Sequence, residues 1–171
     1  SKNLGNYPDP KELLQKYGGD ALRLYLMGSS VMNGEDLIIS EEHYRNQVKG
    51  SMLVLWNTYN FFVSYANIDN WAPGKENKYK SKNVLDEWVL SLLNQLVKDT
   101  TASLDNYDTV TAISKINHFI TGFSGWYIRR SRDRVGPNVA KRENNDEFYA
   151  TTHYVLVTLA KLIAPIAPFL A

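Results

Sequence analysis

The sequence repeats apolar residues at intervals of three and four over four long stretches, which is the spacing of a helix with one buried face. The clearest stretch places Ile113, Ile116, Ile120, Phe123 and Tyr127 at steps of three, four, three and four. Few runs alternate apolar and polar residues as a half-buried strand does. The predicted fold class is therefore all-α, an antiparallel helical bundle. The four stretches cover residues 44–66, 85–104, 113–127 and 148–163.

Helix-start and helix-stop residues divide the first forty positions into smaller units. Asp9-Pro10 predicts the start of a short helix over residues 11–17, because aspartate caps free N–H groups and proline fits the first helical turn. Gly18 is predicted to end this helix, and Asp20 is predicted to cap a second short helix. The expected division is a connecting segment with these two small helices at residues 1–40 and the bundle at residues 41–171.

The first long helix has its own start signal. Ser40 is a capping residue, and Glu41 and Glu42 follow it into the positive first turn, so we interpret this acidic pair as helix-start residues rather than as a catalytic pair. The helix is predicted to run unbroken to about residue 67. The large aromatic residues on the long helices sit at helical spacing and are expected in the core. They are Trp56, Tyr59, Phe61, Phe62, Trp88 and Phe123.

Composition excludes several functional classes. The 171 residues include no cysteine, which rules out a disulfide scaffold, a thiol nucleophile and Cys-ligated zinc. Three widely separated histidines give no metal-ligand spacing, so we expect no metal site. The most apolar stretch, residues 154–171, is broken by Lys161 and two prolines and predicts a buried helix rather than a membrane span. We expect a soluble, cytoplasmic piece of a longer protein with no membrane partner.

Positive charge is concentrated in one place although the whole chain carries only +1. Between Arg129 and Arg142 there are six basic residues and one acid, Asp133. Clustered arginines at a helix end suit phosphate groups, and they equally suit the negative end of the helix dipole. Of the two aromatic residues that precede them, Trp126 could stack on a base, whereas Tyr127 continues the apolar face and is expected in the core.

Several sequence runs resemble the class I aminoacyl-tRNA synthetases. The opening run SKNLGNYPDP resembles the end of the KMSKS loop and the residues just after it, with Asn3 where the last serine of that motif is usual. The run YGGDALRLY at residues 17–25 resembles the segment downstream of this loop, and WYIRRSR at residues 126–132 is most similar to the isoleucyl-tRNA synthetases. The runs LWNTYNFF and LIAPIAPFL fit the same family. The resemblance covers nearly the whole chain.

The resemblance implies a function for the parent enzyme and for this chain. Such enzymes join isoleucine to its tRNA by using ATP, with magnesium, and Lys2 corresponds to the second lysine of KMSKS, which contacts the ATP phosphates. The chain would then be the anticodon-binding bundle, with isoleucine tRNA and the catalytic domain of the same chain as its partners. We expect the isolated chain to be inactive, because it lacks the nucleotide-binding domain. The residues expected to bind tRNA are Trp126, Arg129, Arg130, Arg132 and Arg134.

Two alternatives stay open at this point. The first is the equivalent domain of a valyl- or leucyl-type synthetase, which charging assays would distinguish. The second is a stand-alone helical module that binds protein, whose affinity would depend little on salt, whereas phosphate binding weakens as salt rises. The lysine-rich loop at residues 75–82 is a further, weaker candidate for contact with the tRNA backbone.

Overall fold

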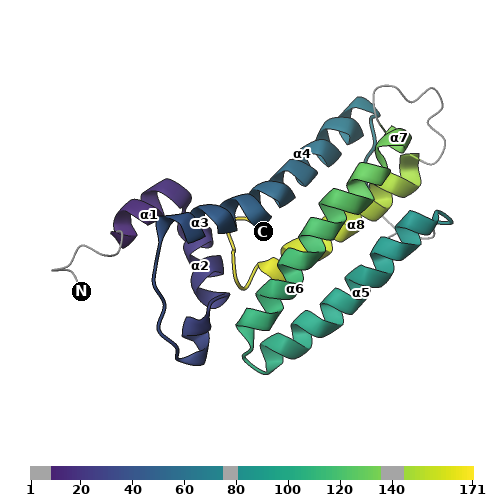
Figure 1. Ribbon diagram of the computed structural model, residues 1–171. Coiled ribbons are helices and arrows are strands. Elements are labelled where there is room, and N and C mark those ends of the chain that lie inside the picture. Colours follow the sequence, from purple (N-terminus) through teal and green to yellow (C-terminus); the bar gives the residue numbers. More distant parts are fainter. Residues whose placement is uncertain (1–8, 75–80, 136–144) are drawn as a thin grey trace.

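The computed structural model describes residues 9–74, 81–135 and 145–171, and these residues form helices and no strand. Four long helical units alternate in direction and make an antiparallel bundle, so the predicted fold class is confirmed (Figure 1). They are α3–η3–α4 (Glu41–Gln47, Val48–Met52, Leu53–Ile68), α5 (Val84–Asp105), α6–η4 (Thr109–Gly122, Phe123–Ile128) and α8 (Asn145–Ile163). The remaining elements are α1 (Pro10–Tyr17), α2 (Gly19–Met27), η2 (Ser30–Asn33) and α7 (Arg132–Val135).

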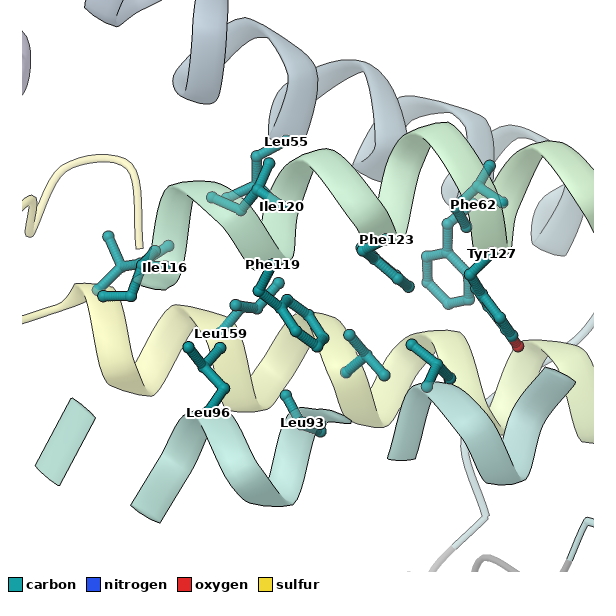
Figure 2. Packing of buried hydrophobic residues seen from close by; sticks show 14 of the residues in the cluster. Leu55, Phe62, Leu93, Leu96, Ile116, Phe119, Ile120, Phe123, Tyr127 and Leu159 are labelled. Carbon is teal, nitrogen blue, oxygen red and sulfur yellow. The ribbon is translucent and has the colours of Figure 1, made fainter. Parts of the chain in front are cut away.

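The bundle core is built from one face of each long helix (Figure 2). All five apolar residues that define the predicted face of the third stretch, from Ile113 to Tyr127, are buried. On α8 the buried set includes Phe148, Val155 and Leu159, which are also on the predicted face. Among the described helices, none combines the length and apolarity that crossing a membrane requires.

The faces of two helices were predicted less accurately. Trp56, Tyr59 and Trp88 were expected in the core, yet Trp56 is 52% exposed, and the other two are also exposed. On α4 the inward position next to Leu55 is taken by Thr58, whose hydroxyl donates to the Val54 carbonyl. The predicted unbroken helix also contains a π-turn at Val48–Met52, and a π-turn widens the helix locally and shifts the face of the next turns.

Most of the predicted helix caps are confirmed. The Asp9 carboxylate accepts from the Lys11 N–H at 2.8 Å, and the Ser40 hydroxyl accepts from the His43 N–H at 3.2 Å. The prediction for Asp20 is wrong. The second helix begins at Gly19 behind Gly18, so Asp20 lies inside the first turn, and its Oδ2 accepts instead from the Leu170 N–H at 2.6 Å, at the other end of the chain.

The N-terminal helices have a small core of their own. Leu13, Ala21, Tyr25 and Tyr44 pack together, and Tyr44 comes from α3, beyond residue 40. Leu24 of α2 belongs instead to the main bundle core. The two cores therefore meet along α2 and at Met52 of η3, and the connecting segment packs against the bundle at the end opposite α7 (Figure 1).

Candidate functional site

The basic run comes after a π-turn at the end of the third long helix. η4 buries Phe123, Tyr127 and Ile128, and the Phe123 and Tyr127 rings stack at 5.6 Å between centroids. The same turn leaves Trp126 48% exposed, and Arg129 and Arg130 directly after it are exposed. π-turns inside helices are frequent at functional sites. Here the turn separates a buried aromatic side from an exposed basic side.

Four of the predicted tRNA-binding residues lie on the exposed side, and we call Trp126, Arg129, Arg130 and Arg132 the exposed arginine surface. The Arg130 guanidinium carbon lies 4.6 Å from the centroid of the Trp126 ring, so the two side chains form a cation–π pair. Across the described residues, no carboxylate oxygen lies within 4 Å of a nitrogen of Arg129, Arg130 or Arg132. Their charge is therefore available to an outside anion.

Arg134, the fifth predicted residue, has a different environment. Its two terminal nitrogens donate to the two oxygens of Asp86 at 2.6 and 2.9 Å, and the guanidinium carbon lies 5.5 Å from the Phe148 ring centroid. The side chain of Arg134 is only 12% exposed, and that of Asp86 is fully buried. The structure therefore places Arg134 inside the bundle and apart from the exposed arginine surface.

Asp86 organises a polar cluster, which we call the Asp86 cluster. Besides the two bonds from Arg134, it accepts from the Tyr127 hydroxyl at 2.7 Å and from the Ser81 hydroxyl at 2.7 Å. Burial alone would raise the pKa of Asp86, but the hydrogen bonds from Arg134, Ser81 and Tyr127 outweigh it and hold this pKa below its ordinary value. Burial and the neighbouring Asp86 charge raise the pKa of Tyr127. The cluster joins the start of α5 to the end of η4 and to α7.

A signal in the sequence could have revealed this cluster. Asp86 stands in register with Val89, Leu93 and Leu96 at steps of three, four and three on the buried face of α5. A charged residue on an apolar helix face needs a buried partner of opposite charge. The partner itself lies 48 positions away and is not readable from the spacing.

The remaining candidates give no further site among the described residues. Lys2 and most of the lysine-rich loop lie outside them, as do Lys141 and Arg142. Glu41 of the acidic pair contacts Lys16 and accepts from the Tyr17 hydroxyl at 2.9 Å, which fixes α3 to α1. No group of three or more histidine, aspartate or glutamate side chains in the described ranges is placed to hold a metal ion.

Comparison with known families assigns the fold. The model for the anticodon-binding domain of tRNA ligases matches residues 86–171, and the model for class I tRNA synthetases of the I, L, M and V group matches residues 1–40. The chain belongs to the family of anticodon-binding domains of tRNA ligases.

The curated proteins that the chain resembles are ligases for one amino acid, isoleucine. The chain is 40% identical over 171 residues to isoleucine–tRNA ligase of Protochlamydia amoebophila and 43% identical over 171 residues to that of Bdellovibrio bacteriovorus. Each alignment covers all of this chain and 16% of the relative, so the chain spans about a sixth of the length of these relatives. The predicted resemblance to isoleucyl-tRNA synthetases is confirmed.

A solved structure of lower sequence identity has a similar fold. A LeuRS from Agrobacterium radiobacter K84, in a ternary complex with tRNA and LeuAMS, superposes with a TM-score of 0.64 at 18% identity. The match covers 99% of this chain and 19% of that one. At this identity the similarity concerns the fold alone.

Proposed function

We propose that this chain is the anticodon-arm-binding part of an isoleucine–tRNA ligase, the cytoplasmic enzyme that attaches isoleucine to its tRNA with ATP and magnesium. The bundle holds the anticodon arm while the acceptor end of the same tRNA reaches the catalytic domain. The division between a connecting segment at residues 1–40 and a binding bundle at residues 41–171 is part of this proposal. The similarity to two isoleucine–tRNA ligases supports the choice of isoleucine over valine and leucine.

The observation that carries the proposal is the exposed arginine surface. Three guanidinium groups without acidic partners among the described residues suit the phosphates of an RNA backbone, because each is planar, permanently charged and able to donate two parallel hydrogen bonds. Trp126 beside them offers a ring on which an unpaired base of the anticodon loop can stack. Arg134 serves this surface indirectly, since its pair with Asp86 fixes the segment that bears the other arginines.

Catalysis by the parent enzyme depends on residues beyond those described. By its place in the motif, Lys2 contacts the ATP phosphates in the intact enzyme. The chain spans only about a sixth of the length of the similar ligases, so we expect no isoleucine-dependent exchange of pyrophosphate into ATP by the isolated chain. Exchange by the purified chain would contradict this part of the proposal.

Binding is tested by titrating the purified chain with isoleucine tRNA and with a non-cognate tRNA at several salt concentrations. We expect tighter binding of isoleucine tRNA and an affinity that falls steadily with salt, by about 0.7–0.9 log units per log unit of salt for each phosphate contacted. Equal binding of both tRNAs would remove the anticodon role. An affinity unaffected by salt would favour a protein partner over RNA.

A further inference from the structure

Two charged residues of α2 hold the far end of the chain. Arg23 donates from Nε to the Ile166 carbonyl at 2.6 Å and from Nη2 to the Pro165 carbonyl at 2.9 Å. Three positions earlier on the same helix, Asp20 accepts from the Leu170 N–H at 2.6 Å. All three partner groups belong to the backbone, so the two residues bind the backbone of the tail after α8. We call Asp20 and Arg23 the tail clamp.

The two charges match the backbone groups that they contact. The carbonyls held by Arg23 lie just beyond the C-terminal end of α8, where the helix dipole favours a cation. The Leu170 N–H held by Asp20 lies in a new turn that starts at Pro168 and closes with a bond from the Ala171 N–H to the Ala167 carbonyl at 3.2 Å. Free N–H groups of such a turn favour an anion, and proline fits its first position. The tail clamp therefore caps one turn and the start of the next.

The clamp has one buried and one exposed member, since Arg23 is exposed and donates to the exposed Pro165 and to the buried Ile166. Asp20 is 4% exposed, and the tail residues Ile166 and Ala167 are buried in the main core. Leu24 of α2 enters the same core. Apolar contacts have no preferred direction, but hydrogen bonds to fixed backbone groups are directional. Apolar packing attaches α2 to the bundle, and the hydrogen bonds of the clamp add contacts of defined direction.

We propose that Asp20 and Arg23 are positioning residues that set the orientation of the binding bundle relative to the segment at residues 1–40; this inference rests on the proposed function. The clamp and the exposed arginine surface lie at opposite ends of the bundle (Figure 1). The 19 residues of α8 make a lever of about 28 Å, so a rotation of about 10° at the clamp moves the other end by about 5 Å. A displacement of the reacting groups by about 1 Å already reduces reaction rates strongly.

The test uses the full-length ligase with Arg23→Gln, with Arg23→Lys, and with Lys11→Gln as a control at an exposed lysine of α1. Three quantities are measured: isoleucine-dependent pyrophosphate exchange, kcat/KM for charging of whole tRNA, and affinity for a hairpin RNA of the anticodon arm. For Arg23→Gln we expect charging to fall about tenfold, while exchange and hairpin affinity stay within about twofold of wild type. Arg23→Lys keeps the charge but cannot donate two hydrogen bonds in the same plane. Its kcat/KM for charging should therefore lie between those of wild type and Arg23→Gln.

The possible outcomes separate this inference from the function that it rests on. If wild-type enzyme does not bind the hairpin, the proposed function fails, and this inference fails with it. If wild type binds and Arg23→Gln charges tRNA normally, only the clamp inference is overturned. A purely structural role predicts that charging and exchange fall together, in step with the folded fraction, and that result would also overturn it. Where Arg23→Gln melts below the assay temperature, Arg23→Lys is read by the same criteria.

Discussion

The exposed arginine surface and the Asp86 cluster use the same residue type, and only one position separates Arg132 from Arg134. Arg129, Arg130 and Arg132 face solvent without an acidic partner among the described residues. Arg134 is enclosed and bonded to both oxygens of Asp86. In the sequence these four arginines form one basic run, but in the fold three are exposed to solvent and one is paired with Asp86 inside the protein.

This division has a physical cause. The short helix α7 carries Arg134, whose guanidinium reaches the start of α5, where Asp86 lies on the buried face. A buried carboxylate is stable only with a partner of opposite charge, and Arg134 is the residue that reaches it. Local charge density therefore indicates where an anion can bind, and long-range pairing decides which of the charges remain for it.

The largest expected effect is on stability, and it concerns the buried arginine, Arg134. Replacing Arg134 with Gln leaves Asp86 buried without its partner and should lower the free energy of unfolding by about 3–5 kcal/mol. Urea unfolding measures this change. The matched control, Arg132→Gln, removes an exposed arginine two positions earlier and should change stability by no more than about 0.5 kcal/mol. If Arg134→Gln left stability intact but weakened tRNA binding, Arg134 would belong to the binding surface after all.

The second effect concerns the exposed members. Replacing Arg129, Arg130 and Arg132 with Gln should weaken binding of isoleucine tRNA by about a hundredfold and reduce the salt slope by about one unit per lost contact. The melting temperature should not change, because these side chains make no ion pair with a described residue. A control that removes the same charge elsewhere, at Lys11, Lys49 and Lys98, should leave the affinity nearly unchanged. Loss of stability in step with affinity would indicate that the arginines only cap the helix.

A third effect separates stacking from charge within the exposed arginine surface. Replacing Trp126 with Ala should weaken tRNA binding by about tenfold, since stacking on one aromatic ring contributes about 1–3 kcal/mol per base. The salt slope should stay as in wild type, because no phosphate contact is lost. Trp126→Phe keeps a ring and should retain part of the affinity. A change in slope with Trp126→Ala would show that the ring acts by holding Arg130 in place.

The sequence was a better guide to the elements than to the pairings between them. Helix periods predicted the bundle and the buried face from Ile113 to Tyr127, because burial along one helix depends on local spacing. Asp20 was assigned to its own helix, whereas it bonds to Leu170, 150 positions away, and spacing says nothing about such a contact. The same limit hid the partner of Arg134. Asp20 lies beside the buried residues Ala21 and Leu24, and Asp86 lies beside the buried Val89. In both helices an acidic residue on an apolar face was the only sequence signal for a buried polar contact.

The smallest expected effect is a difference in acid sensitivity between the two regions. The folded-state pKa of Asp86 lies below the ordinary value of 3.8, so its pair with Arg134 contributes stability above that pH, and this contribution is lost as the pH falls through the folded-state pKa. A variant with Asp86→Asn and Arg134→Gln replaces the pair with uncharged amide groups, while every other carboxylate titrates as in wild type. The difference in melting temperature between wild type and this variant should therefore shrink between about pH 6 and about pH 3.

The triple arginine variant should follow the wild-type curve throughout, because its lost charges have no acidic partner in the described residues. A constant difference for the Asp86–Arg134 variant would mean that the buried pair acts through packing and hydrogen bonding alone, without a contribution from charge.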